Sequence, residues 1–480
     1  MLKKIFGHSF LYTIANQIPL LANLIILPIV TPFLTREDYG IYGLLLAYLG
    51  AFTAFSTIGI DVLFQNTYFK NKINYIKYWK KYFGILLIWR TIYATILTII
   101  LYFLFRNKVN DNITIVLVLV IIPILFFELT KTLGTRYCQY EGKHQYVYIN
   151  SFVASIFAIT ASFISIYYFK LGYLGWLISA LVSGFIQFIF FTYLIHFKLK
   201  IIPNFNNSIS FIKKILKISL PIIPHNYSSY LLESSDRVVL DLNKTPIAEI
   251  GSYNIAYSFS NYFGTFNNTL NTILSPIYFK CFGLKNKKIS VDLVNNITIL
   301  WFSFILISSL FICLWCKEIF QFLYRNSDLY SAYEYVPFII IGLLYRPFYV
   351  ACVDKNIYLE NTKSVLKISV GGGILNLILN LVFIPFYGIK AALFSTLISY
   401  LYMGFSGFYF KDIKANIDFK YNPLIFITII LLAFFLSLKL LNLDVFYKFI
   451  ISLIIIVLTG IIYLIKGKQI INELNKENIL

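Results

Sequence analysis

The chain has 480 residues, of which 59% are hydrophobic and only 13% charged, and its mean hydropathy is +0.75. These values exclude a soluble globular protein, in which about a quarter of the residues are charged. Successive apolar runs of about 18–25 residues are long enough to cross a hydrocarbon core of about 30 Å as helices. A membrane β-barrel would alternate polar and apolar residues instead. The sequence therefore predicts an all-α polytopic membrane protein.

The apolar runs predict about 14 transmembrane helices joined by short connections, with no soluble domain. The first run begins after Met-Leu-Lys-Lys and lacks a small-residue cleavage site, so we expect it to be retained rather than removed as a signal peptide. The predicted spans are 9–34, 38–60, 81–105, 112–135, 146–169, 171–196, 214–241, 246–275, 289–315, 333–353, 364–385, 387–410, 421–440 and 445–465.

The net charge of +20 indicates membrane topology rather than nucleic-acid binding. Most of the 41 Lys and Arg residues lie in the two termini and in alternate loops. Positive residues collect on the cytoplasmic side of a membrane protein, so both termini are predicted to be cytoplasmic. The same residues would attract the anionic headgroups of membrane lipids.

The sequence offers little for catalysis and no complete metal site. Three of the four histidines, His8, His144 and His196, lie at the ends of predicted spans, and only His225 lies inside one. Cys313 and Cys316 have the spacing of metal ligands, but no second ligand pair accompanies them, so packing is the better interpretation. No Gly-rich phosphate loop is present. We therefore expect no cofactor, no metal and no enzymatic activity.

Two pairs of segments, each about 210 residues apart, indicate an internal repeat. "TREDYGIYGLLLAY" (35–48) and "TPIAEIGSYNIAYSF" (245–259) share an acidic residue, a Gly and a Tyr at equal spacing. "LGYLGWLISALVS" (171–183) and "YGIKAALFSTLIS" (387–399) align Gly172 with Gly388. Each copy holds about six spans, an even number, so both copies cross the membrane in the same direction.

The repeat predicts two pseudo-symmetric six-helix lobes. The N-lobe is predicted in residues 1–200 and the C-lobe in 201–412, while residues 413–480 add two helices and a cytoplasmic tail. Transporters built from parallel repeats hold their substrate near the interface of the repeats.

Successive residues of an α-helix are separated by about 100° around its axis. With this rotation, polar residues fall on one face of three predicted spans, 9–34, 214–241 and 246–275. One interpretation is hydrogen bonding between helices. The other is a water-filled cavity that offers donors and acceptors to a hydroxyl-rich solute, and three such faces on repeat-related helices favour it. The predicted lining residues are Asn16, Asn23, Asn226, Ser229, Asn254, Ser258, Asn261, Thr265 and Asn268.

Three arginines, Arg90, Arg237 and Arg346, lie within predicted spans. An arginine near the middle of a membrane must face protein or water. Guanidinium groups suit an anion because they bind phosphate through two hydrogen bonds and keep their proton. The alternative is that each arginine pairs with a carboxylate. This alternative applies most strongly to Arg237 because acidic residues share its face of the helix. The carboxylates available for pairing are Glu128, Glu233 and Asp236.

Four ionisable residues are candidates for gating or ion coupling, on the chemistry of their side chains alone. The Asp236–Arg237 pair lies near the outer end of its predicted span, where a gate or a lobe-to-lobe contact is the better interpretation than a phosphate site. The four candidates are Asp61, His225, Glu233 and Asp236.

Three segments resemble the polysaccharide-transporter branch of the multidrug/oligosaccharidyl-lipid/polysaccharide (MOP) flippase superfamily, the Wzx-type O-antigen and capsule flippases, and the resemblance extends over most of residues 1–412. The first hairpin, "LPIVTPFLTREDYGIYGLLLAY", resembles that family's acidic-Tyr-Gly turn. "SDRVVLDLNKTPIAEIGSYNIAYSF" resembles its Asp-Arg pair and Gly-x-Tyr turn. "GGGILNLILNLVFIPFYGIKAALFSTLISY" resembles its Asn-, Pro- and Gly-containing eleventh and twelfth spans.

The resemblance implies a flippase of the bacterial cytoplasmic membrane that moves undecaprenyl-diphosphate-linked oligosaccharides by alternating access. Arg90, Arg346 and Arg237 would hold the diphosphate, and the polar faces would hold the sugar. A polysaccharide polymerase and a chain-length regulator are implied partners. The alternatives are a lipid II flippase, a drug or cation exporter of the same fold, and, from a different class, a membrane glycan polymerase or ligase. The sugars, the coupling ion and the oligomeric state stay open.

Overall fold

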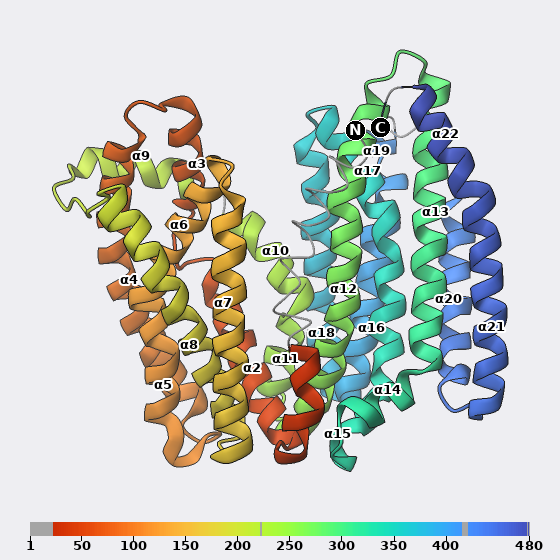
Figure 1. Cartoon of the computed structure of the whole chain (residues 1–480), viewed down its shortest axis with the longest axis horizontal. Helices are drawn as coiled ribbons and strands as arrows, with labels where there is room; N and C mark the ends of the chain where they lie inside the picture. The colour runs from red at the N-terminus through yellow and green to blue at the C-terminus, as the bar shows by residue number, and fades with distance from the viewer. Residues whose placement is uncertain (1–22, 221–222, 415–420, 478, 480) are drawn as a thin grey trace. The chain divides into compact units, whose positions relative to one another are not determined.

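The computed structural model describes residues 23–220, 223–414, 421–477 and 479, and it is all helical within them (Figure 1). The predicted all-α polytopic membrane fold is confirmed. Eight helical segments are long and apolar enough to cross a membrane. They are Tyr75–Phe105, Ile113–Tyr140, His144–Tyr168, Tyr173–Lys198, Lys287–Leu314, Ser327–Tyr358, Val365–Phe408 and Pro423–Leu440.

The count of about 14 spans is approximate because some predicted spans are broken or too polar to count as apolar segments. The predicted spans 364–385 and 387–410 are the two parts of α18 (Thr362–Phe405), which is interrupted by a non-helical residue at Gly388. The predicted span 214–241 consists of three short helices, α9 (Ile209–Ser219), α10 (Ile223–Glu233) and α11 (Ser235–Leu242). Apolar patterning thus predicted the boundary at Gly388 but not the breaks within span 214–241.

The described residues form two compact units, which meet within α10. We call residues 23–230 the N unit and residues 231–479 the C unit. The predicted domain limits at residues 200 and 412 stay predictions. The remaining helices of the N unit are α2 (Arg36–Thr53), α3 (Asp61–Lys70), α4 (Tyr75–Phe105), α5 (Ile113–Ile122), α6 (Glu128–Tyr140), α7 (His144–Phe163) and α8 (Tyr173–Thr192). π-helical turns follow α5, α7 and α8 at Pro123–Phe127, Ile164–Tyr168 and Tyr193–Lys198.

The C unit is built around α12 (Ile247–Phe282), which packs against α13, α16 and α17. Behind these helices, α20 packs on α13 and α16. The remaining helices are α13 (Lys287–Leu314), α14 (Cys316–Leu323), α15 (Ser327–Tyr330), α16 (Val336–Gly342), α17 (Arg346–Tyr358), α19 (Lys411–Lys414), α20 (Pro423–Leu440), α21 (Val445–Ile462) and α22 (Lys468–Lys476).

Asp38, in the first repeat signature, joins two helices of the N unit. Its Oδ2 accepts from the Thr35 backbone N–H at 2.8 Å, while the Thr35 hydroxyl accepts from the Asp38 N–H at 3.1 Å, which closes a capping box on α2. Its Oδ1 accepts from the Tyr173 N–H at the start of α8, at 2.9 Å. One carboxylate therefore satisfies free N–H groups at the beginning of both helices.

Gly172 and Gly388, aligned by the predicted repeat, have the same unusual backbone conformation. Their φ and ψ angles are 53° and −130° at Gly172 and 55° and −133° at Gly388. This region of the backbone map is almost restricted to glycine. Each residue lies between two consecutive membrane-crossing segments, so the two units repeat the same turn at equivalent positions.

The buried charge of Lys448 stabilises the packing of the two helices beyond the repeat, α20 and α21, against the rest of the C unit. Lys448 of α21 is fully buried, and its Nζ donates to both Glu318 carboxylate oxygens at 2.8 and 2.9 Å. It also donates to the Leu441 carbonyl at 3.0 Å. Trp315 Nε1 donates to Ser452 Oγ at 2.9 Å. All three Lys448 protons are satisfied, as a buried ammonium requires.

At one end of the N unit, an aromatic cluster surrounds a carboxylate. Tyr68 packs against Tyr75 and Tyr140, with ring centroids 5.0 and 5.2 Å apart. The Tyr68 hydroxyl donates to Glu141, in the turn after α6, and this hydrogen bond lowers the pKa of the Glu141 carboxyl. The hydrogen bond therefore stabilises the fold wherever Glu141 is ionised.

We expect alanine at Gly172 to destabilise the protein more than alanine at Gly388. Both substitutions force a positive φ, which costs about 1–3 kcal/mol. A Cβ at Gly172 would also lie 2.2 Å from Asp38 Oδ1, whereas a Cβ at Gly388 meets no atom within 4 Å. Thermal unfolding midpoints of the detergent-purified variants measure which substitution is more destabilising, with Gly460→Ala as control. Equal midpoints for Gly172→Ala and wild type would contradict it.

We expect Tyr68→Phe to lower stability at neutral pH and to do so less in acid. The pKa of Glu141 is depressed in the folded protein, so its contribution is present above the ordinary value of 4.5 and lost as pH falls through the folded pKa. Unfolding midpoints at pH 7 and pH 4 measure this, with exposed Tyr102→Phe as control. A deficit that does not depend on pH would contradict the assignment.

Candidate functional site

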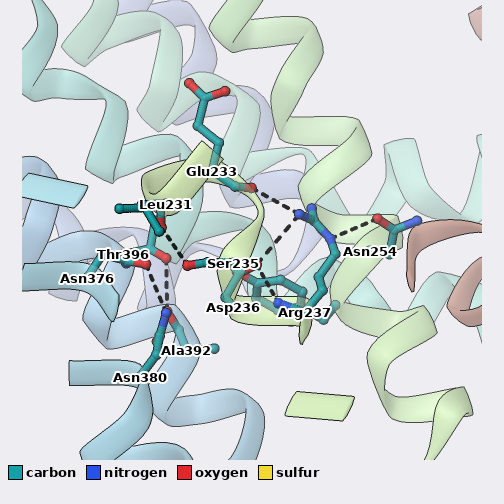
Figure 2. Close-up of polar contacts among 11 residues, drawn as sticks. Leu231, Glu233, Ser235, Asp236, Arg237, Asn254, Asn376, Asn380, Ala392 and Thr396 are labelled. Carbon is teal, nitrogen blue, oxygen red and sulfur yellow. Dashed lines mark hydrogen bonds and ion pairs between the residues drawn. The ribbon is translucent and has the colours of Figure 1, made fainter. Parts of the chain in front are cut away.

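The predicted polar face of span 214–241 is interrupted at Ser234. This residue lies between α10 and α11 with φ −141° and ψ −15°, which is not helical. The rotation of 100° per residue therefore cannot be carried from α10 to Asp236 and Arg237, and the prediction that these residues share one face stays a prediction. Figure 2 shows the resulting bend, with Glu233 and Arg237 on either side of it.

Asp236 is fully buried in the C unit and has three partners. Its Oδ1 accepts from the Arg237 backbone N–H at 2.7 Å, and its Oδ2 accepts from the Tyr253 hydroxyl of α12. The Arg237 Nη1 lies 3.6 Å from Oδ1. A buried carboxylate needs such partners because desolvation is otherwise very costly. These contacts fix α11 against α12.

Arg237 is held by the same network. Its Nε donates to Asn254 Oδ1 at 3.2 Å, and its Nη1 donates to the Glu233 carbonyl at 3.0 Å (Figure 2). Its Cζ lies 4.2 Å from the centre of the Tyr257 ring, within cation–π range. Arg237 is only 6% exposed, so its charge is neutralised and enclosed inside the C unit.

The amides of α18 form a second buried polar group in the C unit. Asn380 Nδ2 donates to Asn376 Oδ1 at 2.9 Å, and both residues are fully buried (Figure 2). Asn376 Nδ2 and Asn380 Oδ1 have no partner. The Thr396 hydroxyl donates to the Ala392 carbonyl at 2.9 Å on the same helix. Unsatisfied buried amides are places where water or a hard cation with oxygen ligands can bind.

Arg346, at the start of α17, is the arginine with the fewest partners among the three candidates. It makes no hydrogen bond or ion pair within the described part of the chain, and its buried Nε has no acceptor. The carboxylate that acts on it electrostatically is Glu233, whose side chain is exposed and points away from Arg237 in Figure 2. An arginine so placed can accept an anionic ligand.

The polar face of α12 divides into a buried and an exposed part. Asn254 is buried against Arg237, and Ser258 and Thr265 are half-buried. Asn261 and Asn268 are exposed. An amide that faces lipid is costly, and α12 is not among the eight segments apolar enough to cross a membrane, so this face favours contact with water.

The predicted anion ligand Arg90 is already paired in the N unit. It is 2% exposed, and its Nη1 donates to the Ile124 carbonyl at 2.8 Å and to Glu128 Oε2 at 3.3 Å. Asp61, which accepts from the Thr57 hydroxyl at 2.7 Å, also acts electrostatically on it. The pairing that the sequence left as the alternative for Arg90 is present, and the buried Nε of Arg90 has no acceptor among the described residues.

Two cavities lie in the N unit, on either side of Tyr42 and Ala180, which line both. The first, of about 190 Å³, contains Glu128 and is otherwise mostly apolar. The second, of about 300 Å³, lies mainly between α7 and α8 and is lined by Asn23 and by Ser151, Ser155, Ser162, Ser179, Ser183 and Gln187.

Sequence reasoning found only Asn23 of this second cavity. The serines follow one face of α7 and of α8 at helical spacing, a signal that was available but that looks like ordinary helix packing. Four other predicted residues cannot be placed. Asn16 and the side chains of His225, Asn226 and Ser229 lie outside the described residues.

Comparison with models of known protein families shows the family to which the chain belongs. A family model described as polysaccharide biosynthesis protein matches residues 6–282, more than half of the chain. The chain belongs to this family. A second model, MatE, matches residues 221–382. Both agree with the resemblance of the sequence to the polysaccharide branch of the MOP superfamily. No curated protein matches the chain in sequence.

Solved structures show the same fold. An inward-facing multidrug resistance MATE family transporter of the MOP superfamily matches with a TM-score of 0.63 at 13% identity, over 83% of this chain and 95% of that one. The lipid II flippase MurJ, in an inward closed conformation, matches with a TM-score of 0.63 at 17% identity, over 92% of this chain and 100% of that one. The protein is thus a multi-pass membrane protein with a transporter and flippase fold.

We expect Glu128→Leu to destabilise the N unit because it leaves the buried Arg90 charge without its carboxylate. Loss of a hydrogen bond to a charged group costs about 1.5–3 kcal/mol. The double variant Arg90→Leu/Glu128→Leu should recover much of this loss, since no charge is left unpaired. Thermal unfolding midpoints of purified Glu128→Leu, Arg90→Leu and the double variant, each compared with wild type, give the coupling energy between the two residues. Additive effects of the two substitutions would contradict the pairing.

Proposed function

We propose that this protein flips undecaprenyl-diphosphate-linked oligosaccharide repeat units from the cytoplasmic to the outer leaflet of the bacterial cytoplasmic membrane, by alternating access. The product would supply assembly of O-antigen, capsule or another surface polysaccharide. Membership in the polysaccharide biosynthesis protein family and the flippase fold support this class of substrate. A polymerase and a chain-length regulator are the partners that such a pathway requires.

The observation that carries the proposal is the unpaired guanidinium of Arg346. A diphosphate brings more than one negative charge into the membrane protein, and a permanent cation with free donors is the group that matches it. Arg90 and Arg237 already donate to carboxylates and carbonyls. We therefore place Arg346 first as diphosphate ligand, and Arg90 and Arg237 stay candidates that would have to leave their ion pairs to bind it.

The sugar would contact the exposed face of α12. Asn261 and Asn268 are exposed, and the half-buried Ser258 and Thr265 extend the same face. Amides supply both donors and acceptors, which suits the hydroxyl and acetamido groups of a saccharide. The predicted residues of α10, Asn226 and Ser229, stay part of this proposal.

For ion coupling we place Asp236 before Asp61. Asp236 is fully buried, and α11 packs against α18, which carries the unsatisfied amides of Asn376 and Asn380. Asp61 is only half-buried and accepts from the Thr57 hydroxyl, so its protonation would be less strongly coupled to an enclosed site. Glu233 and His225 stay candidates for gating.

A lipid II flippase is the second candidate, because MurJ shares the fold over 92% of this chain. A MATE-type drug exporter shares the fold as well. Deleting the gene and extracting lipids separates the three. The proposed function predicts a diphosphate-linked oligosaccharide that accumulates while surface glycan is lost. Accumulated lipid II would favour the second candidate, and normal glycan with altered drug sensitivity would favour the exporter.

We expect Arg346→Ala to reduce export of surface glycan by roughly tenfold or more while the protein stays in the membrane. The variant loses charge-assisted hydrogen bonds worth about 1.5–3 kcal/mol. Arg346→Lys should keep part of the activity because it keeps the charge. Arg106→Ala, at an exposed helix end, is the control. Normal export by Arg346→Ala would remove the assignment of this residue.

A further inference from the structure

The cavity between α7 and α8 is a polar hollow within the N unit. It measures about 300 Å³, at the lower end of the range of about 300–1,000 Å³ for ligand pockets. A seam of serines between two helices normally closes, because small residues let the helices approach. Here α7 and α8 pack together, yet an open space remains between their polar faces. A hydroxyl-lined space of this size must hold water or a polar ligand.

The hydroxyl groups of this cavity are oriented by the helices that carry them. Ser155 Oγ donates to the Ser151 carbonyl at 2.7 Å, and Ser179 Oγ donates to the Ala158 carbonyl across the two helices at 2.7 Å. Gln187 Nε2 donates to Ser183 Oγ at 3.3 Å. Because these donors are used, the lone pairs of the hydroxyl oxygens remain to accept from a ligand.

Ser162 gives an independent indication of a ligand. It is only 5% exposed and lines the cavity. Its hydroxyl makes no hydrogen bond to another described residue, so this largely buried residue brings to the cavity a hydroxyl that is unpartnered within the described part of the chain. Groups of this kind are normally satisfied by water or a ligand.

Aromatic rings complete the cavity. Trp176 and Tyr42 both line it, with ring centroids 5.0 Å apart, and Tyr39 packs edge-on to Trp176 at 4.7 Å. The indole is therefore held in place beside the hydroxyl groups. A rigid ring supplies apolar area for the C–H face of a ligand, while the serines and Gln187 take its polar edge.

None of the described residues that line the cavity carries a carboxylate, amine or guanidinium group. It is thus unsuited to a phosphate or a metal ion, and its polar face is unsuited to an acyl chain. We propose that this cavity is a subsite for an uncharged, hydroxyl-rich sugar residue of the transported lipid-linked oligosaccharide. The inference rests on the proposed function and deepens it, because it assigns the recognition of neutral sugars to α7 and α8 of the N unit.

The test compares the binding of two lipids to the purified full-length protein by native mass spectrometry. One is undecaprenyl diphosphate without sugar, and the other is the oligosaccharide-bearing lipid that accumulates in the deletion strain. The variants are Gln187→Leu, which removes the amide, and Ser151→Leu, which fills the cavity from α7. Thr160→Leu is the matched control, since Thr160 lies on the exposed side of α7.

We expect wild type and Thr160→Leu to bind the sugar-bearing lipid about tenfold more tightly than the bare lipid. Gln187→Leu and Ser151→Leu should lose most of that difference while binding the bare lipid as wild type does, which also shows that they are folded. The inference is overturned, and the proposed function retained, if wild type binds both lipids equally or if both variants keep the difference. Both fall if wild type binds neither lipid.

Discussion

The structure depends on one constraint, which is that every polar or charged group within the membrane must be matched by protein or by water. In the C unit, Asp236 and Arg237 neutralise each other and are enclosed by Tyr253, Tyr257 and Asn254. In the N unit, Arg90 is matched by Glu128. The groups that remain unmatched are therefore the informative ones. Among the described residues they include the Arg346 guanidinium, the exposed amides of α12, the buried amides of Asn376 and Asn380 and the Ser162 hydroxyl.

This division between matched and unmatched groups explains how one fold can serve an amphipathic substrate. Paired charges hold helices together inside each unit and add little to recognition. On the proposed function, Arg346 would supply a charge for an anionic headgroup, and neutral polar surfaces would supply hydrogen bonds for sugars. Because the charged and neutral surfaces involve different residues, the affinity for the diphosphate and the selectivity for the sugar can change independently.

The sequence predicted the helical fold, the membrane location and the repeated turn, because apolar length and glycine placement are local properties. Gly172 and Gly388 confirm this, since they have the same backbone angles. It could not predict partners across helices. Arg90 and Arg346 look alike in sequence, yet only Arg90 meets a carboxylate within 4 Å. The break at Ser234 also escaped, because no proline or glycine marks it, and it changes the faces of all the residues that follow.

The central claim is that the protein moves a lipid-linked oligosaccharide across a membrane with Arg346 as its anion ligand. The most direct measurement places the purified protein in liposomes that contain the lipid in both leaflets and follows the movement of the sugar headgroup with a membrane-impermeant reagent that modifies it. The account predicts that the protein makes the protected pool accessible, and that Arg346→Ala liposomes behave as protein-free ones. A protected pool that stays protected in the presence of wild-type protein would contradict it.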